Sequence, residues 1–204
     1  LQKKDFKGAL PLYRRAEDMY RESGNTKMLL VSLKNQVIAH NGAGITDDLA
    51  RLYTELEKIY RPSGNKDELE YTLKQHAVLL SGKKLTDQAL ELYKELEQLC
   101  RESGSKEKLV LCLASMAVIQ GNRGDHDVAL STLKEHEELC RKLGKKDMLV
   151  KSLLAQAYLF SKNPQYIPKA RGLTEEAISI AADNGYADIL NKARQFLSTI
   201  TQGG

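Results

Sequence analysis

The chain contains 204 residues, of which 42% are hydrophobic and 28% are charged, and it has no tryptophan. The net charge of +4 is small for this length, and Lys and Arg are interleaved with Asp and Glu, so a dedicated surface for nucleic acid is not indicated. No apolar run reaches the roughly 18 residues of a transmembrane helix, and the amino end lacks the apolar core of a signal peptide. We therefore expect neither a nucleic acid nor a membrane among the partners.

Cysteine usage predicts a reducing compartment. Three thiols cannot all form disulfides, no Cys-x-x-Cys motif is present, and Cys100 and Cys140 lie 40 residues apart at equivalent positions while Cys112 lies in an apolar segment. We expect all three to be buried core residues and the protein to be cytoplasmic.

Because the first residue is Leu1 rather than Met, we also expect the chain to be a piece of a longer protein.

Apolar residues at helical spacing predict an all-α protein of about ten helices, with no competing strand pattern. The predicted elements are a helix over residues 1–22, four helix pairs over about 26–62, 66–102, 106–142 and 146–183, and a last helix over 186–200. Pro11 predicts a regular start near Ala9 or a kink, and we favour the late start. The predicted helix caps include Asn25, Thr46, Asn65 and Thr86, while Pro62 is expected to shorten the helix before it.

Glycines that close helices recur at a fixed period. They lie at residues 24, 64, 104, 144 and 185, which gives spacings of 40, 40, 40 and 41. A constant period of this size is typical of a solenoid, in which each unit buries its apolar face against its neighbours. We predict one continuous array over residues 1–204.

The central unit resembles the tetratricopeptide repeat. That family has an A helix with a large apolar residue followed by apolar and small residues, and then a B helix with a small residue after a Gly-Asp turn. Leu113, Met116 and Ala117 fit the A helix, and Gly124-Asp125 and Ala129 fit the turn and the B helix. The period exceeds the usual roughly 34 residues, so the chain is similar to the long-repeat arrays of kinesin light chains and bacterial signalling proteins.

Some residues depart from this pattern at positions that are apolar or small in the family. They are Gln36, His76, His136 and Gln156. In this register the chain begins with a B-type helix, continues with four A/B pairs and ends with a lone A-type helix.

The resemblance implies a right-handed superhelix whose A helices line a concave groove. The predicted groove residues are Val31, Lys34, Ile38, Asn41, Tyr71, Lys74, Val78, Leu111, Ala114, Val118, Lys151, Leu154 and Tyr158. One interpretation is a site for an extended peptide or an amphipathic helix, oriented by Lys34, Lys74 and Lys151. Four of the predicted groove residues, Ile38, Val78, Val118 and Tyr158, form an apolar row. The alternative is that tight curvature of the superhelix packs this apolar row against itself or against another part of the array.

No catalytic, metal or cofactor site is predicted. The four histidines occupy different repeat positions without metal-ligand spacing, and no phosphate-binding glycine loop is present. We expect a non-enzymatic protein-interaction scaffold that binds a peptide or a helix of a partner protein. A sensor or regulatory segment of a larger signalling enzyme or ATPase is the alternative, and a nucleic-acid-binding helical repeat is less favoured. The oligomeric state stays open, because the ends of the array could self-associate.

Overall fold

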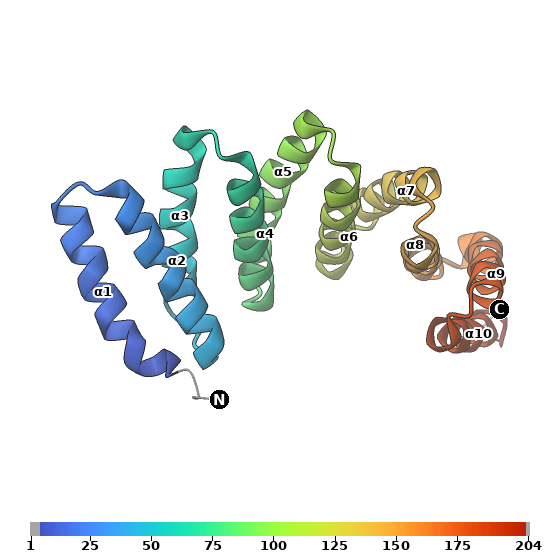
Figure 1. The fold of residues 1–204 in the computed structure, drawn as a ribbon. Helices are drawn as coiled ribbons and strands as arrows, with labels where there is room; N and C mark the ends of the chain where they lie inside the picture. Colours follow the sequence, from blue (N-terminus) through green and yellow to red (C-terminus); the bar gives the residue numbers. More distant parts are fainter. Residues whose placement is uncertain (1–4, 203–204) are drawn as a thin grey trace. The chain divides into compact units, whose positions relative to one another are not determined.

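The structure is a computed structural model that describes residues 5–202. Within these residues, all regular secondary structure is helical, and ten α-helices follow one another along the chain (Figure 1). They are α1 (Phe6–Glu22), α2 (Thr26–Ala43), α3 (Leu49–Ser63), α4 (Lys66–Gly82), α5 (Thr86–Ser103), α6 (Lys106–Arg123), α7 (His126–Leu143), α8 (Lys146–Phe160), α9 (Ile167–Asp183) and α10 (Ala187–Gln202), with a 3-10 helix at Pro164–Tyr166 before α9. The prediction of an all-α protein of about ten helices is confirmed.

Contacts divide the chain into two compact units, Leu1–Leu99 and Cys100–Gly204, and the division falls within α5. Inside each unit, short turns join consecutive helices into antiparallel hairpins (Figure 1). The even-numbered helices take the A-type positions of the repeat and the odd-numbered helices take the B-type positions. The single continuous array over residues 1–204 stays a prediction.

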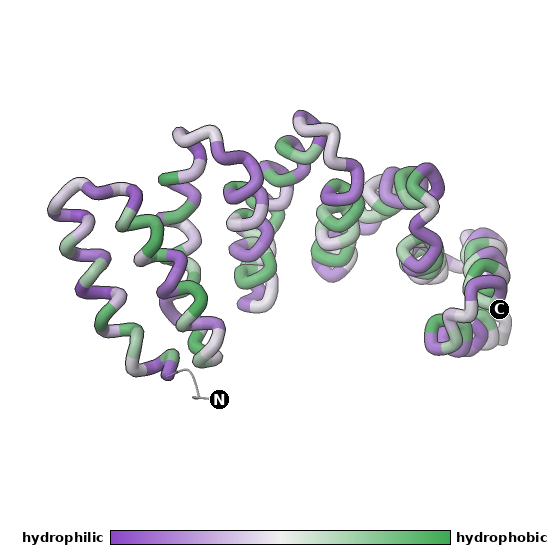
Figure 2. The backbone as a smooth tube through the Cα atoms, viewed as in Figure 1, coloured by the Kyte–Doolittle hydropathy of each residue, from purple (hydrophilic) through white to green (hydrophobic). Residues whose placement is uncertain are grey.

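The core is built from equivalent apolar positions of successive repeats. The A-type helices contribute Leu33, Leu73, Leu113 and Leu153, all of which are almost completely buried. Small residues such as Ala89 and Ala129 are also buried where helices approach each other. Figure 2 shows hydrophobic residues recurring along each helix between hydrophilic ones, as expected for helices buried on one face only.

The glycines that end the helices adopt the conformation that their position requires. Gly24, Gly64, Gly104, Gly144 and Gly185 all have positive φ angles, between 65° and 71°. A side chain at this φ would be strained by contact with the backbone, which explains the repeated glycine. Two predicted caps are also confirmed, since Asn25 Oδ1 accepts a hydrogen bond from the Met28 N–H at 3.1 Å and Asn65 Oδ1 from the Glu68 N–H at 3.4 Å.

The other two predicted caps are wrong. Thr86 is the first residue of α5 rather than the residue before it. Helix α3 begins at Leu49, so Asp48 and not Thr46 takes the cap position. The Asp48 side chain makes no capping hydrogen bond, because its carboxylate accepts hydrogen bonds from Arg51 instead.

Pro11 and Pro62 both lie further inside their helices than predicted. Helix α1 begins at Phe6, not near Ala9, because Asp5 Oδ1 accepts a hydrogen bond from the Gly8 N–H at 2.9 Å, and Pro11 therefore lies inside the helix. Helix α3 continues through Pro62 to Ser63, so this proline does not shorten it. At the other end, α10 includes Thr201 and Gln202. The parts of the predicted first helix and tail at residues 1–4 and 203–204 lie outside the described residues.

Candidate functional site

The A-type helices expose large apolar side chains in both units. In the first unit these side chains lie on α2 and α4, and in the second unit on α6 and α8. They are between 43% and 62% exposed and comprise Val31, Ile38, Tyr71, Val78, Leu111, Val118 and Tyr158. Residues seven apart, such as Val31 and Ile38, lie two turns apart on one face of a helix. The opposite face carries the buried leucines, so these side chains point away from the core of their own unit.

The remaining predicted groove residues surround these apolar side chains on the same helices. Asn41, Lys74 and Lys151 are exposed, whereas Lys34, Ala114 and Leu154 are partly buried. We use the name A-helix stripe for the full predicted set, which is Val31, Lys34, Ile38, Asn41, Tyr71, Lys74, Val78, Leu111, Ala114, Val118, Lys151, Leu154 and Tyr158. The part in the first unit and the part in the second unit are each formed by two helices.

Two of the three lysines of the stripe already have carboxylate partners. Lys34 Nζ lies 2.6 Å from Glu68 Oε1, which links α2 to α4, and the hydrogen bond that Lys34 donates to Glu68 raises the pKa of Lys34. Lys151 Nζ lies 3.5 Å from Asp147 Oδ2, one turn earlier in α8. Lys34 and Lys151 could orient an acidic ligand only if they shared or exchanged these carboxylate partners. Lys74, the third lysine of the stripe, is exposed to solvent.

A pocket opens beside the stripe in the second unit, between α6, α7 and α8. Its volume is about 570 Å³. The lining consists of Ala117, Val118, Gly121, Asn122, Arg123, Gly124, His126, Leu133, Ala155, Tyr158, Leu159 and Lys162. We call it the unit-two pocket. The sequence places Val118 and Tyr158 on the stripe, but it does not reveal that the turn after α6 and the residues after α8 enclose a space next to them.

Three of the four residues that depart from the family pattern pair with acidic residues of the preceding B-type helix. Gln36 Nε2 donates to Glu17 Oε2 at 2.6 Å, and Gln156 Nε2 donates to Glu137 Oε2 at the same distance. His76 Nδ1 lies 2.7 Å from Glu57 Oε1. In each case the two residues are 19 positions apart, so one contact recurs in three repeats. These polar residues therefore belong to the packing between a B-type helix and the A-type helix that follows it.

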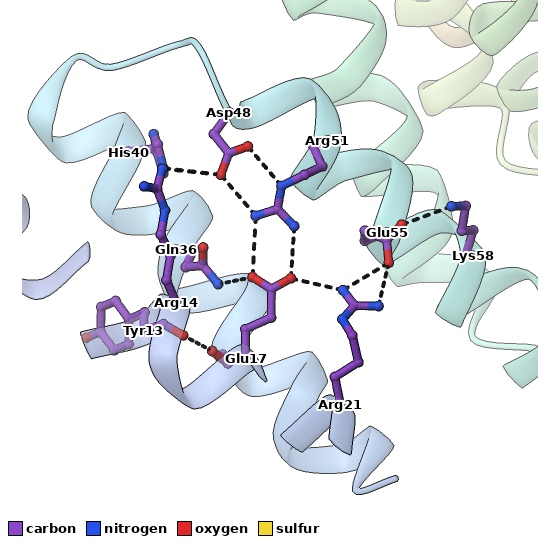
Figure 3. Close-up of polar contacts among 11 residues, drawn as sticks. Tyr13, Arg14, Glu17, Arg21, Gln36, His40, Asp48, Arg51, Glu55 and Lys58 are labelled. Carbon is purple, nitrogen blue, oxygen red and sulfur yellow. Dashed lines mark hydrogen bonds and ion pairs between the residues drawn. The ribbon is translucent and has the colours of Figure 1, made fainter. Parts of the chain in front are cut away.

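Glu17 lies at the centre of the most extended of these networks. Figure 3 shows its carboxylate between the side chains of Gln36, Arg21 and Arg51, which all donate hydrogen bonds to it. Burial alone would raise the pKa of Glu17, but the hydrogen bonds from Arg51, Gln36 and Arg21 together lower it below its ordinary value. A charged carboxylate thus links α1, α2 and α3 inside the first unit.

A second recurring contact joins successive B-type helices. The arginine that begins each closing Arg-x-x-Gly segment pairs with a glutamate 34 or 35 residues later. The pairs are Arg21–Glu55 at 3.1 Å, Arg61–Glu95 at 2.8 Å, Arg101–Glu135 at 2.7 Å and Arg141–Glu176 at 2.6 Å. Because they are partly exposed, such pairs contribute modestly to stability and mainly fix which residues face each other.

Three of the four histidines and all three cysteines are buried in the core, whereas His126 is exposed. His76 and His136 are buried, as predicted, and so is His40. All three cysteines are buried and none forms a disulfide within the described residues, and burial raises the pKa of Cys140 to about 11, which keeps this thiol protonated and unreactive near neutral pH. Within residues 5–202, no group of three or more His, Cys, Asp or Glu side chains is placed to hold a metal ion.

The sequence predicts no transmembrane helix, and the helices of the structure test this prediction. None of the helices in the described part of the chain combines the length and the apolar character needed to cross a bilayer.

Comparison with known proteins places the fold. No model of a known protein family matches the chain, and no curated protein matches it in sequence. Among solved structures, it is similar to nearly identical TPR-like repeats of a Podosopora anserina protein described as a kinesin light chain, with a TM-score of 0.68, 15% identity and 89% of each chain covered. The chain therefore has a tetratricopeptide-like repeat fold, as its sequence pattern predicts.

Two signalling proteins are similar over a part of their length. A Rap protein complexed with Competence and Sporulation Factor has a TM-score of 0.54 and 11% identity, with 98% of this chain and 60% of that chain covered. A signal transduction ATPase of the STAND class from Pyrococcus horikoshii, which has a tetratricopeptide repeat sensor, has a TM-score of 0.52 and 16% identity, with 97% and 38% covered. At these identities the likeness concerns the fold alone.

Proposed function

We propose that the chain is a non-enzymatic protein-interaction module that binds a peptide or a helix of a partner protein on the A-helix stripe. The observation that carries the proposal is the set of seven large apolar side chains that the A-type helices expose in both units. B-type helices also expose large apolar side chains, namely Leu12, Met19 and Val128. Those of the A-type helices are more numerous and recur at equivalent positions in both units, which favours a binding surface over a merely solvated face. The Rap protein, complexed with Competence and Sporulation Factor, is a precedent for ligand binding by a similar fold.

Burial of these apolar side chains by the partner would supply most of the binding free energy. Fully burying a side chain such as Val or Leu is worth about 1.5–3 kcal/mol, and a half-exposed side chain gains a part of that. Lys74 would add electrostatic orientation and a faster on-rate for an acidic partner. No cofactor enters this mechanism, and the buried cysteines, none of which forms a disulfide in the part of the chain that the structure describes, are consistent with a cytoplasmic location.

The test compares two double variants in affinity capture from a native lysate. Val78→Glu with Val118→Glu changes the stripe once in each unit. Met19→Glu with Val128→Glu is the matched control, because these side chains are 59% and 54% exposed but lie on the B-type helices α1 and α7. Both variants must first show the helicity and melting temperature of the unmodified chain.

We expect the stripe variant to lose the partners that the control variant retains. If both variants lose the same partners, or if only the control loses them, the binding surface is not the A-helix stripe. If the stripe variant alone fails to fold, the apolar row belongs to the packing of the array, as the alternative from sequence holds.

A second candidate function is a sensor segment of a larger signalling enzyme or ATPase. The unit-two pocket favours it, because a ligand bound there would contact three consecutive helices at once. The STAND-class ATPase with its tetratricopeptide repeat sensor is a precedent for this role. The two candidates differ in the expected ligand, which is a protein in the first case and a small molecule in the second.

The less favoured candidate, a nucleic-acid-binding helical repeat, makes a distinct prediction. Binding would weaken steeply as the salt concentration rises, because each neutralised phosphate releases counterions. Partner binding through apolar side chains would depend only weakly on salt. With a net charge of +4, we propose that nucleic acid is not a partner.

A further inference from the structure

The unit-two pocket has an apolar interior. Ala117, Leu133, Ala155 and Leu159 line it together with Val118 and Tyr158. Gly121 also faces this space, and a Cβ added there would meet only Leu159 Cδ2 at 3.9 Å, so the absence of a side chain enlarges the pocket. Its volume of about 570 Å³ lies within the roughly 300–1,000 Å³ that is usual for small-molecule sites.

Two cationic side chains, Arg123 and Lys162, line the pocket, and the imidazole of His126 lies beside them. No Asp or Glu is part of the described lining. Arg123 is partly neutralised, because its Nε lies 3.0 Å from Asp125 Oδ2. Lys162 Nζ lies 4.1 Å from the centroid of the Tyr158 ring. Within residues 5–202, Lys162 has no carboxylate at ion-pair distance, so its charge is available to a ligand that lies against the ring.

Backbone dipoles do not reverse this electrostatic preference. The carboxyl end of α6, at Asn122 and Arg123, and the amino end of α7, at His126, both border the pocket. The first carries partial negative charge and the second partial positive charge, so the two offset each other. The side chains therefore decide the sign, and they favour an anion.

We propose that the unit-two pocket binds a small organic acid that consists of an apolar body joined to one carboxylate. The apolar body lies among Ala155, Leu159 and the ring of Tyr158, and the carboxylate accepts hydrogen bonds from Lys162. A small molecule fits better than an extended peptide, because the lining has no carboxylate and a single amide side chain, Asn122, to accept hydrogen bonds from the peptide's backbone N–H groups. This inference does not depend on partner binding by the A-helix stripe.

The test measures binding of 4-phenylbutyrate and octanoate to the full chain by isothermal titration calorimetry. Neutral 4-phenylbutanamide is the control ligand, because it keeps the ring and removes the charge. Two variants are used, neither of which alters the stripe. Lys162→Gln removes the cation, and Ala155→Phe fills the pocket.

Each variant has a matched control elsewhere in the second unit. Lys134→Gln removes an exposed lysine of α7, and Ala182→Phe enlarges an exposed alanine of α9 that lies neither on the stripe nor in the pocket lining. Melting temperatures measured by circular dichroism show which variants are folded. Only folded variants enter the titrations.

We expect saturable binding of at least one of the two acids at one site per chain. The amide and the Lys162→Gln variant should bind at least about tenfold more weakly, since a hydrogen bond to a charged group contributes about 1.5–3 kcal/mol. Ala155→Phe should abolish binding, and the two control variants should bind as the unmodified chain does.

Three results would overturn the proposal. The first is the absence of saturable binding of both acids to the unmodified chain. The second is equal affinity for the acid and its amide, which would remove the role of Lys162. The third is binding that survives Ala155→Phe, which would place the ligand elsewhere. If a captured protein partner but neither acid protects the amides of Ala155 and Leu159 from hydrogen exchange, the pocket belongs to the partner-binding surface instead.

Discussion

Lys84 is, among residues 5–202, the only residue other than glycine with a positive φ, at 61°. The residues 40 positions before and after it are Gly44 and Gly124, with φ angles of 68° and 86°. The turn between an A-type helix and its B-type helix therefore requires the left-handed conformation, and in this repeat it is adopted by a residue with a Cβ. Such a conformation costs free energy, because the Cβ approaches the backbone.

Replacement of Lys84 by Gly should therefore stabilise the protein. We expect the free energy of unfolding to rise by about 0.5–1 kcal/mol, since relief of the strain exceeds the entropic cost of glycine in the unfolded chain. Urea unfolding of the full chain measures the change. Lys83→Gly is the control, because Lys83 has a φ of −82° and should lose stability. A Lys84→Gly variant that is less stable than the unmodified chain would contradict this account of the turn.

Glu17 should make the stability of the first unit depend on pH. Hydrogen bonds from Arg51, Gln36 and Arg21 outweigh the effect of burial and lower its pKa. Its contribution to stability is fully present above the ordinary carboxyl pKa and is lost as the pH falls through the lowered value in the folded state. Glu17→Gln should cost about 2 kcal/mol at pH 7, because two arginines lose a charged acceptor.

The measurement is urea unfolding between pH 3 and pH 8, with Glu22→Gln as the control in the same helix, where the side chain is exposed. Glu17→Gln should flatten the loss of stability on the acidic side, and Glu22→Gln should leave it unchanged. A Glu17→Gln variant with the same acidic loss as the unmodified chain would show that other carboxylates are responsible.

Sequence analysis identifies Gln36, His76 and Gln156 as polar residues at positions expected to be apolar, but it does not identify their partners. Glu17, Glu57 and Glu137 lie 19 positions earlier on helices that carry several acidic residues, and nothing in the pattern distinguishes these three from the other acidic residues. The signal that could have found them is the period, because each lies four positions before the arginine of a closing Arg-x-x-Gly segment. Burial of a charged group is a property of the packed helices and not of composition.

At the scale of elements, the same contact between a B-type helix and the next A-type helix recurs with different residues. In three repeats, Gln36, His76 or Gln156 contacts a glutamate carboxylate of the preceding B-type helix. Met116 takes the same position in α6. The position therefore accepts both hydrogen-bonding and apolar side chains. Glu57 is 3% exposed, so the residue at position 76 must supply a hydrogen bond.

His76→Gln should be tolerated, and His76→Leu should not. We expect the Gln variant to stay within about 1 kcal/mol of the unmodified chain, and the Leu variant to lose about 1–3 kcal/mol, because Glu57 would lose one of its buried partners. Guanidinium unfolding measured by circular dichroism provides both values. Equal stability of the two variants would contradict the role of the hydrogen bond.

The helices themselves follow from the sequence, whereas their exact ends do not. Apolar spacing and the closing glycines locate all ten helices, because burial and the left-handed turn require those residues. The start of α1 depends on one hydrogen bond from Gly8 to Asp5, and the start of α3 on which residues Asp48 contacts. Where each of these helices begins is therefore decided by a single polar contact, and the sequence offers several other residues that could make such a contact.

At the scale of the whole molecule, the period of 40 residues accounts for the repeated fold but not for the spaces between helices. The exposed members of the A-helix stripe follow from helical periodicity, because the residues between them must face the core. The unit-two pocket does not follow, since it depends on how α6, α7 and α8 and the turn after α6 meet. Lys162 in particular lies after the end of α8, where no repeat position predicts its role.

The most direct test of the central claim is site-specific photo-crosslinking to a captured partner. A benzophenone amino acid is placed singly at Val78 or Val118 on the stripe, and at Met19 or Val128 on the B-type helices as controls of similar exposure. If the stripe is the binding surface, crosslinks to the partner form from the first two positions and not from the controls. Crosslinks that form only from Met19 or Val128 would contradict the account and move the binding surface to the B-type helices.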